Sequence, residues 1–476
     1  MDDPVNRRVP LCVDLDGTLL KTDLFCESFL TLVRKRPLDA LRAPFWLMSG
    51  KAHLKAEIAS RVDIGDIALP FNDEVVDFIA DERKVRKTVL VTGSHQSLAE
   101  VVAERCKLFD EVQGSDAELN LTGDNKRDWL VERFGQNGFD YIGNDRNDLK
   151  VWPAARQALA VSAPSGVGGD TSVRFARLFS TQKPGLGDYL GMMRVHQWLK
   201  NALLGVPYLL EHHFDDPRAL AAVLLGILVM GLLASATYII NDLLDLPADR
   251  RSQAKHVRAL ASGRVPITHG VLAVLVLGLA ALLLASFLPP LFQLSMLAYL
   301  GLTLCYSFFL KRVAIIDVIA LSMLYTLRVV AGTLVIGAEW SFWLLAFAMF
   351  LFMSLALAKR VAELVNLERT GRHQVIGRDY SVADRELLTM TGVVTGYLSV
   401  LIFVLYINSE KVLRAYDTPQ LLWFVCPVLM YWIGHIWLAT HRGRMNEDPI
   451  VFAFEDRASL ITVSVLGSVL ALAMFL

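Results

Sequence analysis

Three aspartates that directly follow a long apolar run have a spacing that suits metal chemistry. Asp242, Asp245 and Asp249 are three and four positions apart, so a helix would place them on one face. Carboxylates held so close repel one another unless a cation neutralises them, and oxygen ligands of this kind suit Mg²⁺. Together with the neighbouring Asn241, they predict a magnesium site where a transmembrane helix leaves the bilayer.

Basic residues follow the aspartates within a few turns, and they predict that the ligand carries phosphate. The group comprises Arg250, Arg251, Lys255 and Arg258. Guanidinium and ammonium groups are the usual protein partners of phosphate oxygens. The alternative is a solvated loop that merely carries the positive charge of a cytoplasmic face. Such a loop needs Lys and Arg but not three aligned aspartates, so a Mg²⁺–diphosphate site is favoured.

A second set of chemically suited residues lies in the N-terminal part of the chain, in four motifs, three of which follow short apolar segments. Asp14, Asp16, Gly17 and Thr18 follow the first, and Thr92-Gly93-Ser94 follows the second. Lys126 lies at the start of an expected helix, and Asn144, Asp145 and Asp148 follow the last segment. Strands that alternate with helices and end in polar residues predict an open parallel α/β sheet with its site along one edge.

These four motifs, in this order, resemble those of the haloacid-dehalogenase-like (HAD) phosphatases over residues 9–165. The resemblance implies Asp14 as a nucleophile that forms an aspartyl-phosphate, and Asp16 as the general acid and base. It implies that the phosphoryl group and Mg²⁺ are held by Thr92, Gly93, Lys126, Asp14, Asp16, Asp145 and Asp148. The sequence departs from the family at Asn144, where an acid usually follows the glycine. A domain without catalysis is the alternative, and the intact Asp14 and Asp16 argue against it.

Composition divides the chain of 476 residues into two unlike parts. We expect a phosphatase domain over 1–165 with a helical cap near 22–80, a linker with an interfacial segment over 166–187, and a membrane domain over 188–476. In the cap, Phe45-Trp46-Leu47-Met48 is either part of the cap core or a patch that touches a membrane or partner; the core is favoured. The net charge of −1 argues against nucleic-acid binding, and five cysteines without CxxC spacing indicate neither zinc nor disulfides.

Apolar runs predict an all-α membrane domain with nine transmembrane helices. They lie near 199–210, 219–240, 267–288, 291–309, 315–336, 340–358, 388–407, 420–440 and 458–476. The N-terminus lacks the apolar core of a signal peptide, which places the first domain in the cytoplasm. Lys and Arg then concentrate in the cytoplasmic loops, as the positive-inside rule requires. We therefore expect a multi-pass protein of a bacterial-type inner membrane with both active sites facing the cytoplasm.

Further polar residues lie at the same rims of the predicted helices. They are Lys200, Asn201, Tyr306, Lys311, Lys359 and Tyr380. Arg328 falls in the middle of a predicted span, where an unpaired charge costs several kcal/mol, so it should face a polar cavity. Lysines and arginines that extend toward the headgroups at helix ends explain Arg312 and Arg442, but not Arg328.

Residues 186–476 resemble the UbiA superfamily of intramembrane prenyltransferases, whose signature is the Asn-Asp-x-x-Asp-x-x-x-Asp pattern at Asn241–Asp249. Within it, the chain is similar to the decaprenyl-phosphate phosphoribosyltransferases of cell-wall biosynthesis. The points of likeness are Gln197–Asn201, Tyr306 with Lys311 and Asp317, Lys359–Glu363 and Glu447–Phe452. The sequence 252–259 keeps Lys255 and Arg258 but lacks the prolines that usually flank them.

The resemblance implies a Mg²⁺-dependent enzyme that transfers 5-phosphoribosyl from phosphoribosyl pyrophosphate to a polyprenyl phosphate. The HAD domain would then remove the 5-phosphate. The alternative is an aromatic prenyltransferase that uses a prenyl diphosphate, with a phosphatase of separate purpose. A transporter or scaffold is disfavoured because transporters gather charge at the bilayer midplane, whereas here it lies at one rim. Isoprenoid length and homo-oligomerisation stay open.

Overall fold

The computed structural model describes residues 9–475 except 117, 163–172, 181–182, 212, 253–254, 370–377 and 446–448. The chain divides into two compact units. The first contains Met1–Met193 and Tyr238–Val274, and the second contains Arg194–Thr237 and Leu275–Leu476. The signature aspartates therefore belong to the same compact unit as the N-terminal α/β domain.

The N-terminal domain is built on a six-stranded sheet whose neighbouring strands are all parallel, as predicted. In sheet order the strands are β3 (Glu111–Ser115), β2 (Thr88–His95), β1 (Leu11–Val13), β4 (Asp140–Gly143), β5 (Gln157–Val161) and β6 (Phe175–Phe179). Strand β1 is central because it pairs with β2 on one side and β4 on the other. Strand β6 lies in the stretch 166–187 that we predicted as linker, so part of that stretch belongs to the sheet.

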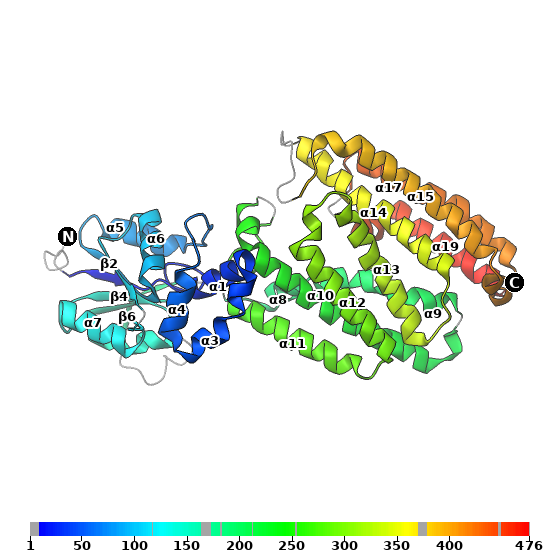
Figure 1. Ribbon diagram of the computed structural model, residues 1–476. Coiled ribbons are helices and arrows are strands. Elements are labelled where there is room, and N and C mark those ends of the chain that lie inside the picture. The colour runs from blue at the N-terminus through cyan, green and yellow to red at the C-terminus, as the bar shows by residue number, and fades with distance from the viewer. Residues whose placement is uncertain are drawn as a thin grey trace. The chain divides into compact units, whose positions relative to one another are not determined.

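Alternate residues of the strands enter two separate cores, one on each face of the sheet. On one face Leu11, Leu90 and Ile142 pack with helices α5 (Asp73–Glu82) and α6 (Gln96–Cys106). On the other face Val89 and Tyr141 pack against Leu130 of α7 (Asp124–Phe134). Figure 1 shows these helices on opposite sides of the strands. Burial on both faces explains why the strands read as continuous apolar runs.

Four helices between β1 and β2 form the predicted cap: α1 (Leu24–Lys35), α2 (Pro37–Ala40), α3 (Ala43–Met48) and α4 (Lys51–Ala59). Helices α1 and α4 supply the apolar residues of the cap core, Leu24, Leu32, Leu54 and Ile58. Our assignment of Phe45–Met48 to that core was wrong: Phe45 is 70% and Met48 84% exposed, and only Trp46 of the four packs against the core. Helix α3 has six residues, too few to bury more than one edge.

Among the described residues, eight helices are long and apolar enough to cross a membrane. They are α10 (Pro217–Arg251), α11 (Ile267–Ala285), α12 (Pro290–Phe308), α13 (Ile316–Ile336), α14 (Phe342–Arg369), α15 (Arg385–Ile407), α17 (Val425–His441) with the 3₁₀ turns before it, and α19 (Arg457–Phe475). Nine spans are therefore not confirmed. The first expected span is split into α8 (Leu186–Met193), a 3₁₀ segment (Val195–Gly205) and α9 (Val206–Leu210). Each piece is shorter than a bilayer-spanning helix.

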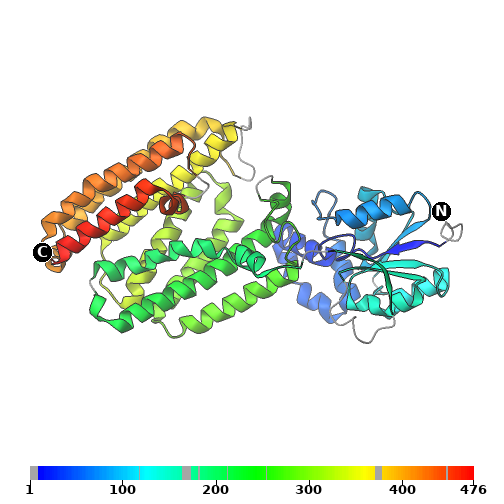
Figure 2. The ribbon, with the colours of Figure 1, turned by 180° about the vertical axis from the view of Figure 1, so that it is seen from behind.

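A large hydrophobic core of the second unit lies between several of its long helices. Residues of α13, α14, α15, α17 and α19 contribute, among them Val329, Phe352, Phe403, Trp437 and Ala473. Figure 2 shows the long ribbons of α14, α15, α17 and α19 running side by side. The shorter helices α16 (Glu410–Ala415) and α18 (Pro449–Glu455) lie between these spans in sequence. Helix α10 continues past the expected end at 240 to Arg251, so the aspartate signature is helical throughout the pattern.

Candidate active sites

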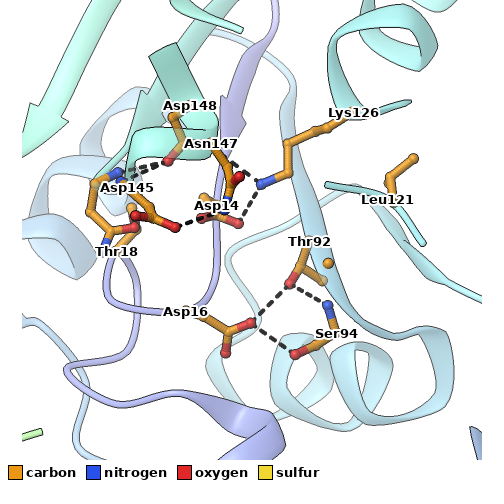
Figure 3. A network of polar contacts seen from close by, with 12 residues as sticks. Asp14, Asp16, Thr18, Thr92, Ser94, Leu121, Lys126, Asp145, Asn147 and Asp148 are labelled. Carbon is orange, nitrogen blue, oxygen red and sulfur yellow. Dashed lines mark hydrogen bonds and ion pairs between the residues drawn. The ribbon is translucent and has the colours of Figure 1, made fainter. Parts of the chain in front are cut away.

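The carboxyl ends of β1, β2 and β4 and the start of α7 bring the four N-terminal motifs together (Figure 3). Asp14 and Asp16 follow β1, Thr92 and Ser94 lie at the end of β2, and Lys126 lies in the first turn of α7. Asp14, Thr92, Ser94 and Lys126 are buried, although all are polar. Since buried polar groups need partners, their hydrogen bonds define what each can do.

Asp14 is held against a buried lysine. Lys126 Nζ donates to Asp14 Oδ1 at 2.8 Å and to the hydroxyl of Tyr141 at 3.0 Å. Burial raises the pKa of Asp14 to about 7, although the charge of Lys126 works to lower it. Burial works to lower the pKa of Lys126, but the carboxylates of Asp14 and Asp148 offset it, so that pKa is raised. A carboxylate beside a fixed cation suits nucleophilic attack on phosphorus, because the cation stabilises the charge of the phosphoryl oxygens.

Asp16 has different partners. Its Oδ1 accepts from the backbone N–H of Leu24 at 2.7 Å, and its Oδ2 accepts from Ser94 Oγ at 2.8 Å and from Thr92 Oγ1 at 3.4 Å. Burial raises the pKa of Asp16 to about 6, with the Asp23 carboxylate adding to the effect. A carboxyl whose pKa lies near neutrality suits proton transfer in both directions. The hydrogen-bond partners of Asp14 therefore suit a nucleophile, and those of Asp16 suit a general acid and base.

The loop after β4 is organised by Asp148. Its Oδ2 accepts from the backbone N–H groups of Asn144 and Asp145 at 2.9 and 3.0 Å, and its Oδ1 accepts from the hydroxyl of Tyr141 at 2.7 Å. A Cβ at Gly143 would lie 2.5 Å from Asp148 Oδ2, so this approach requires glycine. Asn144 accepts from Thr18 Oγ1 at 3.0 Å, and Asp145 is exposed.

Among the described residues, no three acidic, histidine or cysteine side chains converge as a metal site. The role of Asp145 and Asp148 as ligands thus stays a prediction. Mg²⁺ is commonly held by one or two carboxylates with waters and substrate phosphates, and the oxygens of Asp14 and Asn144 suit that chemistry.

A cap lysine that sequence analysis missed lies beside this site. Lys55 of α4 donates to the carbonyl of Gly93 and to Asn120 Oδ1, the latter at 2.9 Å. Burial lowers its pKa, against the opposing pull of the Asp16 and Asp23 carboxylates. A small pocket next to it is lined in part by Phe25, Ser94 and His95. A cationic cap residue held over Gly93 is suited to recognise the anionic end of a phosphomonoester.

Two of the signature aspartates of α10, Asp242 and Asp249, converge on one basic side chain. Arg258 Nη1 donates to Asp242 Oδ1 at 3.0 Å and to Asp249 Oδ2 at 2.7 Å. Both carboxylates are buried, and Asp245 and Asn241 on the same helix are partly exposed. One nitrogen between two buried carboxylates occupies the kind of position that suits a cation. Lys255, also partly exposed, lies three residues before Arg258.

Arg250 and Arg251, which we expected to hold phosphate together with Arg258, contact the phosphatase cap region instead. Arg250 Nη2 pairs with Glu27 of α1 at 2.6 Å, and its Nη1 donates to the carbonyl of Ala68 at 2.9 Å. Both charged side chains of this pair are buried. Arg251 donates to the carbonyl of Asp66. The basic cluster is therefore divided between the aspartate site and the α/β domain.

In the second unit Arg328 of α13 is buried in a polar environment, as its mid-span position predicted. Its Nε donates to Asn201 Oδ1 at 3.1 Å and its Nη2 donates to the hydroxyl of Tyr299 at 3.0 Å. The guanidinium also lies 5.4 Å from the ring centre of Tyr325, and Lys200 Nζ lies 5.8 Å from the same ring. Among the described residues Asn201 Nδ2 is buried without a hydrogen-bond acceptor, so this cationic cluster retains a donor for an anionic group.

A second polar cluster of this unit, the Asp317 cluster, comprises Tyr306, Asp317, Arg360, Glu363, Arg378 and Tyr380. Asp317 pairs with Arg360 Nε at 2.7 Å and accepts from the hydroxyl of Tyr380. Arg360 Nη2 donates to the hydroxyl of Tyr306 at 3.4 Å. The predicted residues Tyr306 and Tyr380 are thus linked through Asp317 and Arg360. Lys359 lies on α14 beside Arg360, and Lys311 lies in the 3₁₀ turn Leu310–Arg312 between α12 and α13; both are partly exposed.

The chain is similar to a known protein family and to several known proteins. The model of the UbiA prenyltransferase family matches residues 201–459. An uncharacterised protein of Sinorhizobium fredii is 38% identical over 99% of this chain and 92% of its own length. The nodulation protein NoeC of Azorhizobium caulinodans is 32% identical over 58% of this chain and 89% of its own. The decaprenyl-phosphate phosphoribosyltransferase of Mycobacterium tuberculosis is 35% identical over 38% of this chain and 61% of its own.

Solved structures resemble each part more distantly. A UbiA homologue from Archaeoglobus fulgidus covers 60% of this chain and 99% of its own, with 16% identity and a TM-score of 0.45. A probable phosphoserine phosphatase from Vibrio cholerae covers 39% of this chain and 64% of its own, with 13% identity and a TM-score of 0.27. Four HAD motifs along one sheet edge identify the first domain as HAD-like, and the family match covers more than half of the chain. The protein is therefore a member of the UbiA prenyltransferase family that carries an N-terminal HAD-like domain.

Proposed function

We propose that this protein is a bifunctional membrane enzyme that makes a polyprenyl-phosphoryl ribose in two steps. Its transferase would move 5-phosphoribosyl from phosphoribosyl pyrophosphate to a polyprenyl phosphate of the decaprenyl type. Its HAD domain would then remove the 5-phosphate. The observation that carries the proposal is the presence in one chain of a HAD-type acid pair and a UbiA signature, where a relative at 35% identity is a decaprenyl-phosphate phosphoribosyltransferase.

In the first step an oxygen of the lipid phosphate attacks C1 of the ribose, the bond from C1 to the diphosphate oxygen breaks, and pyrophosphate leaves. The residues proposed to bind the diphosphate and phosphates are Asn241, Asp242, Asp245, Asp249, Lys255, Arg258, Lys311 and Lys359. We further assign Lys200, Asn201, Tyr306, Arg328 and Tyr380 to substrate binding. The buried Arg328 and the unpaired amide donor of Asn201 support this assignment, because both suit an anionic group.

In the second step Asp14 attacks phosphorus while the bond from phosphorus to the ribose 5-oxygen breaks. Asp16 gives its proton to that oxygen and then takes one from the water that hydrolyses the aspartyl-phosphate. Thr92, the backbone at Gly93 and Lys126 hold the phosphoryl oxygens. The separate partners of Asp14 and Asp16 support this division of roles. Mg²⁺, when bound by the acidic residues of either site, would neutralise phosphate charge.

Both sites are proposed to face the cytoplasm, where phosphoribosyl pyrophosphate is available. A product that stays in the membrane remains close to a phosphatase on the same chain, and such tethering raises its effective concentration. The proposal therefore explains why two unrelated domains are fused.

Purified protein in lipid vesicles tests the proposal directly. With labelled phosphoribosyl pyrophosphate, polyprenyl phosphate and Mg²⁺, we expect mass spectrometry to detect the ribosylated lipid without its 5-phosphate. Asp14→Asn should accumulate the 5-phosphorylated lipid at an unchanged transfer rate. A parallel reaction contains a prenyl diphosphate and an aromatic acceptor. Product from that reaction alone would establish the aromatic prenyltransferase, and complete 5-phosphate removal by Asp14→Asn would remove the HAD domain from the pathway.

A further inference from the structure

The cap carries a concentration of exposed apolar side chains that the catalytic roles do not use. Within the described part of 9–162, seven large hydrophobic residues are exposed, and five of them lie between 38 and 48. These five, the cap patch, are Leu38 (79% exposed), Leu41 (71%), Phe45 (70%), Leu47 (49%) and Met48 (84%). A soluble domain rarely exposes large apolar side chains so close together unless they contact a partner or a membrane.

The cap patch has the pattern of an interfacial helix. Leu38 of α2, Leu41 of the turn that follows it, and Phe45 and Met48 of α3 are three and four positions apart in sequence, and all four are exposed. Trp46 fixes the opposite side of α3: it packs against the cap core, and the guanidinium of Arg61 lies 4.7 Å from its ring centre. The packing of Trp46 against the cap core therefore fixes α3, and the exposed apolar side chains of α3 point away from that core.

The basic charge around the cap patch favours an anionic partner. Residues 34–51 contain five basic side chains, Arg34, Lys35, Arg36, Arg42 and Lys51, against the single acid Asp39. Asp39 is itself paired with Arg42 at 3.5 Å, and Lys35, Arg36 and Lys51 are exposed. Apolar residues within a basic border are typical of segments that insert at the surface of an anionic bilayer. The domain is covalently joined to a chain with eight candidate membrane spans among its described residues, so such a bilayer is always near.

We propose that the cap patch inserts into the headgroup region of an anionic membrane and thereby presents the phosphatase site to a lipid-linked phosphomonoester. The patch belongs to the same cap as Lys55. Insertion of the cap into the membrane would therefore also position Lys55, which is suited to recognise the phosphate end of the substrate. The part that concerns substrate presentation rests on the proposed phosphatase function, whereas the insertion itself does not.

Crosslinking of the full-length protein tests insertion without any need for activity. The photoreactive residue p-benzoylphenylalanine replaces Phe45, and in a matched control it replaces Leu119, an exposed apolar residue of the same domain. In vesicles that contain phosphatidylglycerol we expect lipid adducts at position 45, at least several-fold more than at 119, and fewer in pure phosphatidylcholine. Adducts only to protein, or equal lipid adducts at both positions, would overturn the proposal.

Phosphatase activity then tests whether the inserted cap patch presents the phosphatase site to a lipid-linked substrate. Phe45→Glu with Met48→Glu should lower kcat/KM for a lipid-linked phosphomonoester in the same vesicles about tenfold, because charged residues leave the headgroup region. The same variant should keep kcat/KM for soluble p-nitrophenyl phosphate within about twofold, since both side chains are exposed. Val85→Glu with Leu119→Glu is the matched control and should change neither. Equal losses on both substrates would refute presentation, and a wild-type protein inactive on both would instead reject the phosphatase function and leave the crosslinking result standing.

Discussion

The protein has two pairs of aspartates, Asp14 with Asp16 and Asp242 with Asp249. The members of the first pair have separate partners, whereas the members of the second pair share one. Asp14 is bound by Lys126, whereas Asp16 is bound by Ser94 and the N–H of Leu24. Asp242 and Asp249 instead share a single nitrogen of Arg258. Separate partners give two carboxylates two chemical roles. A shared cationic partner suits the role proposed for both, which is to hold positive charge.

The distinction explains why one pair suits covalent chemistry and the other suits binding of a cation with an anionic ligand. In the HAD-like domain, burial raises the pKa of both aspartates, to about 7 and about 6, and their different partners suit the proposed division between a nucleophile and a proton carrier. In α10 the two carboxylates lie seven positions, about two turns, apart on one helix face, and both pair with Arg258. Mutations that remove one member of each arrangement therefore have different expected effects.

The largest effect expected is on the transferase. Asp242→Asn removes one charge from the shared site and should lower the transfer rate by about 10²-fold or more, because stabilisation of the leaving diphosphate is the main catalytic term. Phosphatase activity toward p-nitrophenyl phosphate should not change. Asp216→Asn is a matched control, since Asp216 accepts from the N–H of Arg218 at 2.8 Å near the opposite end of the same helix. Transfer activity retained in Asp242→Asn would contradict the shared-site interpretation.

A smaller effect should show whether Arg258 occupies the position that Mg²⁺ would take between Asp242 and Asp249. Arg258→Gln leaves two buried carboxylates without their common partner, a loss on the order of 1–3 kcal/mol for buried charged groups. We expect the unfolding temperature of the metal-free protein to fall by several degrees and Mg²⁺ to restore most of it. Wild-type protein should gain less from Mg²⁺. Thermal unfolding in detergent with and without Mg²⁺ measures both, and a variant that does not respond to Mg²⁺ would exclude a cation between the aspartates.

The sequence was sufficient to predict most of the fold and both acid clusters, because each depends on local spacing. Strand ends followed by polar residues predicted the sheet edge that carries Asp14 and Lys126. Of the nine spans that the apolar runs predicted, eight match helices that are long and apolar enough to cross a membrane. The remaining one is interrupted at Arg194, whose φ of 52° breaks the helix, and the run contains Pro207. Such interruptions depend on tertiary packing, which periodicity does not record.

Partners distant in sequence were the part that sequence analysis could not supply. Lys55 contacts Gly93 and Asn120 across the cap, and Arg250 contacts Glu27 across 223 positions. The sequence analysis did not single out Lys55, and it predicted that Arg250 binds phosphate. For Arg360 and Asp317 a signal existed, because a charge within an apolar run must find an opposite charge. The segment Phe45–Met48 was misassigned to the cap core because an apolar residue is buried only if another element covers it.

A moderate effect should test whether the two sites of the first unit depend on one another. Arg250 follows Asp249 directly, and its pair with Glu27 fixes the first turns of α1, where the N–H of Leu24 holds Asp16. Arg250→Ala leaves Glu27 buried without its cation, so we expect kcat/KM for p-nitrophenyl phosphate to fall about threefold to tenfold. Arg250→Lys should recover part of it. Arg251→Ala, the exposed neighbour, is the control; an equal loss in that variant would show that the effect is not specific to the pair.

The smallest effect expected is on the pH dependence of stability, and it concerns Asp16. Its pKa in the folded domain, about 6, lies above the ordinary value of 3.8, because burial penalises the charged form. Asp16 therefore contributes stability that is fully present below about pH 4 and is lost as the pH rises through about 6. Asp16→Asn cannot ionise but keeps an oxygen to accept from Leu24. In metal-free protein we expect this variant to be more stable than wild type at pH 8, by on the order of 1 kcal/mol, with the difference vanishing near pH 4. Chemical unfolding followed at both pH values measures the difference. A variant that is less stable than wild type at pH 8 would show that the charge of Asp16 is stabilised by its partners, and that its proton is not held for catalysis.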